Sequence, residues 1–195
     1  MGDLFGLRCA ACGRPGAPLC SACVSGLTPS ASSSAPGCDR VLAAFAYERT
    51  ARRLILDLKL TAARACAAPL ARGMADQVMR CGLYADAITW VPGRRADIRK
   101  RGFDHAAVLA RAVASLLGLP TRALLHRTGS SQDQAGLSRR ERFRNLQGAF
   151  AAHPCHGRVA LVDDLFTTGA TAGACTRALL VAGSQQVEVL VAARV

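Results

Sequence analysis

The chain has 195 residues and an apolar content of 51%, which suits one α/β domain with a small appendage and is ample for a core. No apolar run is long enough to cross a bilayer, and the first residues lack the basic and then apolar layout of a signal peptide, so we expect a cytoplasmic protein without membrane insertion. The formal net charge of +12, carried mostly by arginine, favours anionic partners, either phosphates or nucleic acid.

Four cysteines near the N-terminus form the pattern C-x2-C-x7-C-x2-C: Cys9, Cys12, Cys20 and Cys23. Two such knuckles supply four thiolates, which suits a closed tetrahedral zinc site. Two disulfides are the alternative, and a cytoplasmic location disfavours them. Because cysteine fills all four positions, the predicted zinc is structural and holds a segment too small to fold alone.

A segment rich in Ser, Ala, Pro and Gly follows the cysteines, from Pro29 to Gly37. This composition is typical of a linker. We therefore divide the chain into a zinc knuckle over residues 1–28, a linker over residues 29–40 and a main domain over residues 41–195.

Strand-like and helix-like segments alternate along the main domain. Short apolar runs predict strands at Val41–Tyr47, Ala87–Val91, Thr121–Leu125, Arg158–Val162 and Val187–Ala192. Longer segments predict helices at Thr50–Leu60, Ala62–Cys81, Phe103–Leu117 and Ala172–Val181, with a basic helix or turn at Ser138–Asn145. Such alternation predicts the α/β class, a mostly parallel sheet covered by helices on both faces.

Two basic segments lie between these elements. The first follows the strand that ends at Val91, and its basic residues are Arg94, Arg95, Arg99, Lys100 and Arg101. The basic residues of the second are Arg139, Arg140, Arg142 and Arg144. Arginine forks bind phosphate oxygens, so both segments fit either a pyrophosphate or a nucleic-acid backbone, and a solvated charged face is the alternative.

The stretch Val159–Thr171 reads VALVDDLFTTGAT, an apolar strand that ends in Asp163 and Asp164. A turn before the next helix follows, made of Thr167, Thr168, Gly169, Ala170 and Thr171. A helix N-terminus with nearby hydroxyls favours a phosphate, and carboxylates can accept hydrogen bonds from a sugar or hold a divalent ion. An ordinary polar turn is the alternative. The sequence has no G-x-x-x-x-G-K-[ST] loop and no G-x-G-x-x-G turn that opens a helix, so a nucleoside triphosphatase and a dinucleotide fold are unsupported.

This stretch resembles the signature of the type I phosphoribosyltransferases, which bind phosphoribosyl pyrophosphate (PRPP). The resemblance implies that Asp163 and Asp164 hold the ribose hydroxyls and that the turn from Thr167 to Thr171 cradles the 5-phosphate. It also implies that magnesium accompanies PRPP, in addition to the structural zinc.

Further motifs narrow the resemblance. In chain order they are Tyr47-Glu48, Leu58-Lys59, Val91-Pro92, Arg101-Gly102-Phe103, the Q-x-G-L-S-x-x-x-R-x-x-N run from Gln134 to Asn145, and Gly148–Phe150. With the cysteine pairs, this order resembles the ComF family of phosphoribosyltransferase-like proteins, which is linked to DNA uptake in natural competence. The resemblance implies a pyrophosphate loop at Trp90–Gly93, with candidate contacts at Val91, Pro92, Gly93 and Arg94. Its implied partners are PRPP, single-stranded DNA and the DNA-uptake machinery.

The chain departs from the family pattern in several places. Trp90 stands where the family has the first proline of P-V-P, and Asp104-His105 replace Asn-Gln. Thr167 stands where purine-salvage enzymes of the superfamily place an Asp base, so no general base for a nucleobase is identified. We therefore predict a PRPP-binding protein that acts in the handling of single-stranded DNA. The alternative is an active phosphoribosyltransferase with an unidentified nucleobase or amine acceptor and no DNA role.

Overall fold

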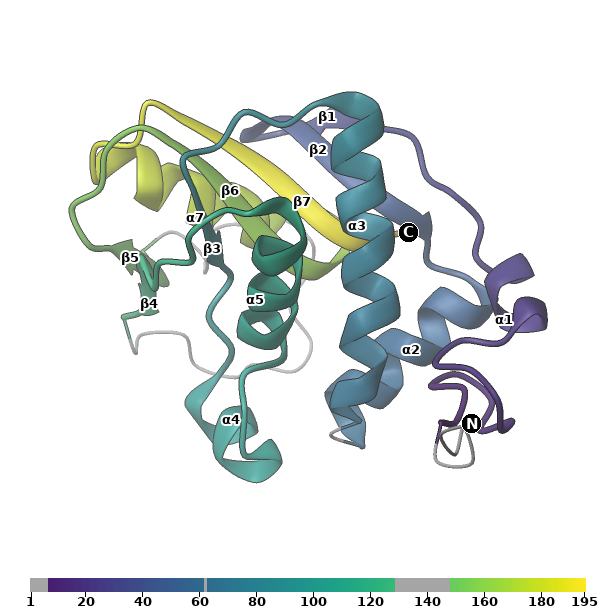
Figure 1. Ribbon diagram of the computed structural model, residues 1–195. Coiled ribbons are helices and arrows are strands. Elements are labelled where there is room, and N and C mark those ends of the chain that lie inside the picture. The colour runs from purple at the N-terminus through teal and green to yellow at the C-terminus, as the bar shows by residue number, and fades with distance from the viewer. Residues whose placement is uncertain (1–6, 62, 129–147) are drawn as a thin grey trace.

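A five-stranded sheet in the order β1-β2-β7-β6-β3 forms the centre of the molecule (Figure 1). The structure is a computed structural model that describes residues 7–61, 63–128 and 148–195. The sheet is parallel from β2 to β3, and only β1 pairs in the antiparallel sense. Its strands are β1 (Ser33–Ala35), β2 (Cys38–Ala46), β3 (Ala87–Trp90), β6 (Arg158–Phe166) and β7 (Gln186–Arg194).

Helices cover both faces of this sheet. On one face lie α2 (Arg49–Leu60), α3 (Ala67–Cys81) and α5 (His105–Leu117), and on the other lies α7 (Ala170–Val181). Alternate residues of β6 face the two cores, because successive side chains of a strand point in opposite directions. Ala160 and Val162 pack on the side of α3 and α5, whereas Val159 and Leu161 pack on the side of α7. The predicted α/β class, with a mainly parallel sheet and helices on both faces, is confirmed.

The predicted helices have clear local causes. In α2, whose apolar period is ambiguous in the sequence, Leu54, Ile55 and Leu58 form the buried face. The side chain of Asp104 caps α5 by accepting the N–H of Ala106 at 3.1 Å, and Gly118 ends that helix with a φ of 67°. The helix predicted over 62–81 is a 3-10 turn, η2 (Arg64–Cys66), followed by α3. In the described ranges no helix is both long and apolar enough to cross a membrane.

The segment predicted as a linker, 29–40, contains β1 and the first residues of β2. Ser33 pairs with Val41, and an isolated bridge joins Pro29 to Phe45. Composition does not reveal this pairing, because the hydrogen bonds of an edge strand come from the backbone and need no apolar side chains. The segment is therefore an edge of the sheet and not a free spacer, and the division of the chain into three parts stays a prediction.

Other elements also differ from those expected. The strand predicted at 121–125 is only a bridge between Ile88 and Thr121, and β4 (Leu125–Arg127) pairs instead with β5 (Phe150–Ala152). β6 continues past the predicted end to Phe166, because its pairing with β7 persists to that residue. Two short helices, α1 (Ser21–Ser25) and α4 (Arg95–Arg101), were not predicted. The predicted basic helix at 138–145 lies outside the described residues.

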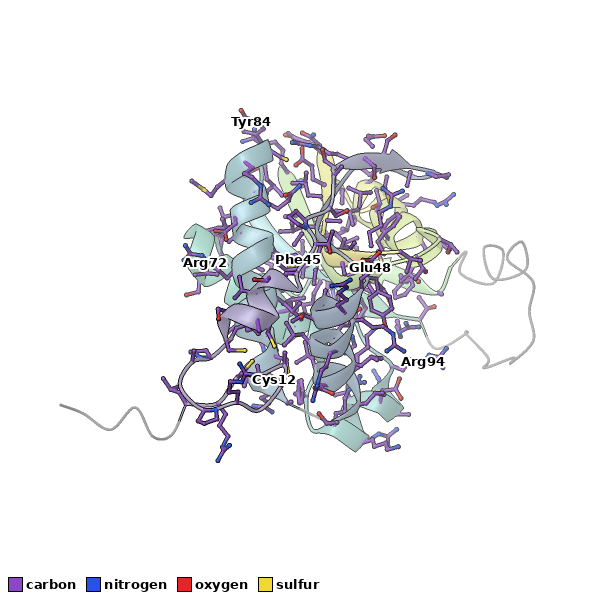
Figure 2. All side chains as sticks on the ribbon, turned by 90° about the vertical axis from the view of Figure 1, so that its right-hand side faces the viewer. Cys12, Phe45, Glu48, Arg72, Tyr84 and Arg94 are labelled. Atoms are coloured by element: carbon purple, nitrogen blue, oxygen red, sulfur yellow. The ribbon has the colours of Figure 1, made fainter. Side chains whose placement is uncertain are left out.

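Gly73 allows α3 to pack directly on the ring of Phe45, which lies beside that helix (Figure 2). A Cβ atom at this position overlaps the ring. Gly73→Ala normally stabilises a helix by about 1 kcal/mol, but here we expect the free energy of unfolding to fall by about 1–3 kcal/mol. Urea unfolding measures this change.

Phe45→Leu provides the matched background for this test. It removes the ring, so Gly73→Ala should there be neutral or stabilising, and the double-mutant cycle should show strong coupling. Additive effects of the two substitutions would contradict the proposed contact.

Candidate functional site

A cavity of about 390 Å³ opens at the carboxyl ends of β3 and β6. This is the edge where parallel α/β sheets bind ligands. The structure brings two separate predicted segments together here, the loop after β3 and the acid pair with its following turn. The predicted residues that line the cavity are Val91, Pro92, Gly93, Arg94, Arg101, Asp163, Asp164, Thr167 and Thr171.

The N-terminus of α7 forms an adjoining hollow of about 50 Å³. Gly169 begins the helix with a φ of 76°, a conformation that favours glycine, and a Cβ there would meet the Phe166 ring at 2.8 Å. The first N–H groups of a helix have no acceptor within that helix and attract anions. The predicted turn lines this hollow: Thr167, Thr168, Gly169, Ala170 and Thr171.

The two adjacent acids have different surroundings. Asp164 has a side chain only 3% exposed, and its Oδ1 and Oδ2 lie 2.9 Å from Lys59 Nζ and His105 Nε2 respectively. Asp163 is half-buried, and its Oδ1 accepts the N–H of Asp164 at 2.9 Å. Asp163 therefore has the greater freedom to contact a ligand, whereas Asp164 is held by two basic side chains.

Their pKa values move in opposite directions. Burial, followed by the negative charge of Asp164, raises the pKa of Asp163 to about 7. Burial also acts to raise the pKa of Asp164, but His105 and Lys59 outweigh it and lower that pKa. Near neutral pH Asp164 is therefore ionised, while Asp163 is present in both forms and can donate as well as accept hydrogen bonds.

Arg127 of β4 lines the same cavity, although no motif predicted it. Its Nε donates to the carbonyl of Pro92 at 3.0 Å, and its guanidinium lies 4.7 Å from the centre of the Phe150 ring. Burial, followed by the charge of Arg94, lowers the pKa of Arg127. The side chain supports the loop after β3 and adds positive charge beside it.

Further contacts fix this loop and its neighbours. The N–H of Gly93 donates to Oδ2 of Asp104 at 3.0 Å, and Arg101 Nη1 donates to the carbonyl of Lys59 at 3.0 Å. Neither Lys59 nor His105 was assigned a role in the site from the sequence: Lys59 was part of the Leu58-Lys59 motif, and His105 was part of a departure from the family pattern. Their position beside the acids depends on how α2 and α5 pack on the sheet, which residue spacing does not encode.

The remaining predicted basic residues do not join the cavity lining. Arg95, Arg99 and Lys100 are exposed on α4. The second basic segment lies outside the described residues: Arg139, Arg140, Arg142 and Arg144.

The four predicted cysteine ligands converge. Their sulfur atoms all lie within 4.8 Å of one another, and Cys12 and Cys20 are 3.7 Å apart. Tetrahedral zinc with bonds of about 2.3 Å requires sulfur separations of about 3.8 Å. Cys9 Sγ also accepts the N–H of Cys20 at 3.4 Å, and although burial raises the pKa of this thiol, backbone N–H groups lower it to about 6. The cluster therefore fits one structural zinc ion.

The cysteine cluster packs against the main core, away from the loop that carries Arg94 (Figures 1 and 2). Cys9 and Ala11 are buried together with residues of α2 and α3. The thiol of Cys66 donates to the carbonyl of Ala10 at 3.5 Å. The cysteine cluster therefore packs on α2 and α3 of the main domain.

A mainly parallel sheet with acids and a helix N-terminus at its carboxyl edge defines an α/β protein with a candidate anion-binding site. The chain is 30% identical over 192 residues to DNA utilization protein YhgH of Salmonella typhimurium, a match that covers 93% of this chain and 81% of that protein. It is 32% identical over 110 residues to Competence protein F of Haemophilus influenzae, which covers 53% of this chain and about half, 48%, of that protein. The chain therefore belongs to the Competence protein F and YhgH family, as its motifs predicted.

Solved structures show a similar arrangement at lower identity. Glutamine PRPP amidotransferase from B. subtilis matches with a TM-score of 0.48 and 22% identity, over 67% of this chain and 26% of that chain. Adenine phosphoribosyltransferase from Leishmania tarentolae matches with a TM-score of 0.43 and 17% identity, over 68% of this chain and 59% of that chain. No family model matches the sequence.

The cysteine cluster predicts about one zinc ion per chain in the reduced, purified protein. Cys12→Ser removes one of four ligands, so it should lower the zinc content and the midpoint of thermal unfolding while the sheet remains folded by circular dichroism. Elemental analysis and a thermal melt measure both effects.

Cys81→Ser is the control, because Cys81 lies outside the cluster. It should leave the zinc content unchanged. Absence of zinc from the parent, or equal zinc in Cys12→Ser, would rule out the site.

Proposed function

We propose that this protein binds PRPP in the cavity at the carboxyl ends of β3 and β6. The observation that carries the proposal is the convergence on one cavity of three parts that a phosphorylated sugar needs. These are the carboxylate of Asp163, the N-terminus of α7 and a loop flanked by arginines. The separate sequence motifs come from distant parts of the chain, and the fold supports their joint use.

Each part suits one portion of the ligand. The first N–H groups of α7 and the hydroxyls of Thr167 and Thr171 suit the 5-phosphate. Asp163 suits the ribose hydroxyls, since a carboxyl group with a pKa near 7 can accept or donate. The loop at 91–94 suits the pyrophosphate, with positive charge from Arg101 and Arg127 on its sides. Magnesium accompanying PRPP would neutralise part of the pyrophosphate charge.

We further propose that PRPP binding serves the handling of single-stranded DNA, in the cytoplasm and together with the DNA-uptake machinery. The names of the relatives, DNA utilization protein and Competence protein F, support this direction. The exposed basic residues of α4 support it as well, because Arg95, Arg99 and Lys100 do not line the cavity and remain accessible to a second polyanion.

A phosphoribosyltransferase with an unidentified acceptor is the competing function. Thr167 lines the cavity where related purine-salvage enzymes place an acid, and a hydroxyl is a poor general base near neutral pH. Binding is therefore proposed ahead of catalysis. Pyrophosphate release from PRPP with nucleobases or amines would instead support the transferase.

Asp163→Asn should weaken PRPP binding about tenfold to a hundredfold, because hydrogen bonds to an ionised group contribute about 1.5–3 kcal/mol each. Titration calorimetry with PRPP and magnesium measures the change. Asp163 is preferred over Asp164, since Asp164→Asn also leaves Lys59 without its buried counter-charge.

Asp86→Asn is the matched control, because Asp86 is exposed and pairs with Arg158, the first residue of β6, at the opposite end of that strand from Asp163. This variant should bind PRPP like the parent. If Asp163→Asn binds PRPP as tightly as the parent, Asp163 does not bind the ribose. An equal loss of affinity in both variants would indicate a general effect of charge.

Arg95→Glu combined with Arg99→Glu should weaken single-stranded DNA binding and flatten its dependence on salt. Each phosphate contact on a single strand contributes about 0.7 to the slope of log affinity against log salt, so losing two contacts should lower the slope by about 1.4. A gel-shift series across salt concentrations measures it. PRPP binding should be retained, since neither residue lines the cavity.

Arg72→Glu, compared with Arg95→Glu alone, serves as the control for the change in net charge. Arg72 is exposed on α3, on a different side of the molecule from Arg94 (Figure 2). It should lower DNA affinity less than the α4 substitutions do. If the parent does not retard single-stranded DNA even at low salt, the DNA proposal fails while PRPP binding is untouched.

A further inference from the structure

Three side chains that line the cavity and can bind metals lie close together. His105 belongs to the first turn of α5, and Asp163 and Asp164 lie near the end of β6. One ligand atom from each lies within 4.8 Å of the others. Two rigid elements therefore place one nitrogen and two oxygen donors around a common point.

The contact between His105 and Asp164 is short but is not a well-formed hydrogen bond. Nε2 and Oδ2 are 2.9 Å apart, yet Oδ2 is buried and has no hydrogen-bond partner within the described ranges. Two neighbouring ligands of an octahedral metal, with bonds of about 2.1 Å, lie about 3.0 Å apart. The observed separation therefore fits two atoms that share a cation.

One oxygen of Asp164 remains available to a divalent ion. Lys59 contacts Oδ1 of Asp164 at 2.9 Å, so Oδ2 remains as the donor on the other side of the carboxylate. The second ring nitrogen of His105 is buried and faces Asp104 Oδ1 at 4.0 Å. This distance is too long for a hydrogen bond, so the support that a carboxylate usually gives a metal-binding histidine would need a small movement of the ring.

We propose that His105, Asp163 and Asp164 form a divalent-cation site that binds Mn²⁺ more tightly than Mg²⁺. Mg²⁺ strongly prefers oxygen donors in near-ideal octahedral geometry. An imidazole nitrogen beside two carboxylates instead favours a first-row transition ion. The site lies in the cavity proposed for PRPP, but the inference needs no bound PRPP, because the protein's own side chains supply three ligands.

The test is a titration of the zinc-loaded full chain with Mn²⁺ in the absence of PRPP, with free Mn²⁺ measured by electron paramagnetic resonance. About one Mn²⁺ per chain should bind outside the cysteine cluster, which thiolates fill with zinc. Mg²⁺ should displace it only at an excess of at least about tenfold, because Mg²⁺ gains little from the nitrogen donor.

His105→Gln should weaken Mn²⁺ binding at least about tenfold. Loss of a residue that only supports a metal ligand already lowers metal affinity by about this factor, and His105 would be a ligand itself. Asp163→Asn is the second variant and should weaken it similarly, and a thermal melt checks that both variants are folded. His153→Gln is the control, since His153 is exposed beyond β5 and is not part of the cluster.

The absence of Mn²⁺ binding, or equal binding by His105→Gln and the parent, would overturn the proposed site. Equal competition by Mg²⁺ would overturn the preference. Because Mn²⁺ alone is the probe, these outcomes are distinct from a failure to bind PRPP, which calorimetry with PRPP measures separately.

Discussion

The position of β6 in the middle of a parallel run is the constraint on which the site depends. β6 is hydrogen-bonded to β3 on one side and to β7 on the other, and its side chains enter both hydrophobic cores. Such a strand has room for polar side chains only where a neighbouring strand stops. The acids at 163 and 164 follow Val162, the last residue of β6 that pairs with β3, although pairing with β7 continues to Phe166. The packing that stabilises the fold therefore also determines where the candidate site lies.

The position of β6 also gives its two adjacent acids, Asp163 and Asp164, different surroundings. One turns toward α2 and α5, where it contacts Lys59 and His105, and the other faces the open cavity. Burying a carboxylate is costly unless it is paired. Asp164 is paired and stays ionised, so burial and the negative charge of Asp164 together raise the pKa of Asp163. Of these two adjacent aspartates, Asp164 is therefore a fixed negative charge, whereas Asp163 can be protonated or ionised.

The sequence predicted the class of fold and much of the cavity, because both depend on local patterns. Buried parallel strands are short apolar runs, and the turn before α7 has its own composition. Arg127 could not be predicted in this way, since it reaches the cavity only through the pairing of β4 with β5, in which it lies opposite Phe150. β1 was missed for a similar reason, because edge pairing by backbone groups leaves little trace in composition.

The contact between the cysteine cluster and the main core has a consequence for the abundance of the protein in a cell. Cys9 and Ala11 are buried among residues of α2 and α3, so a chain that never acquires its metal would leave apolar surface uncovered on those helices. Surface of this kind attracts chaperones and proteases. The supply of zinc during synthesis would then affect how much of the protein accumulates, although the cysteine cluster lies away from the cavity at the carboxyl ends of β3 and β6.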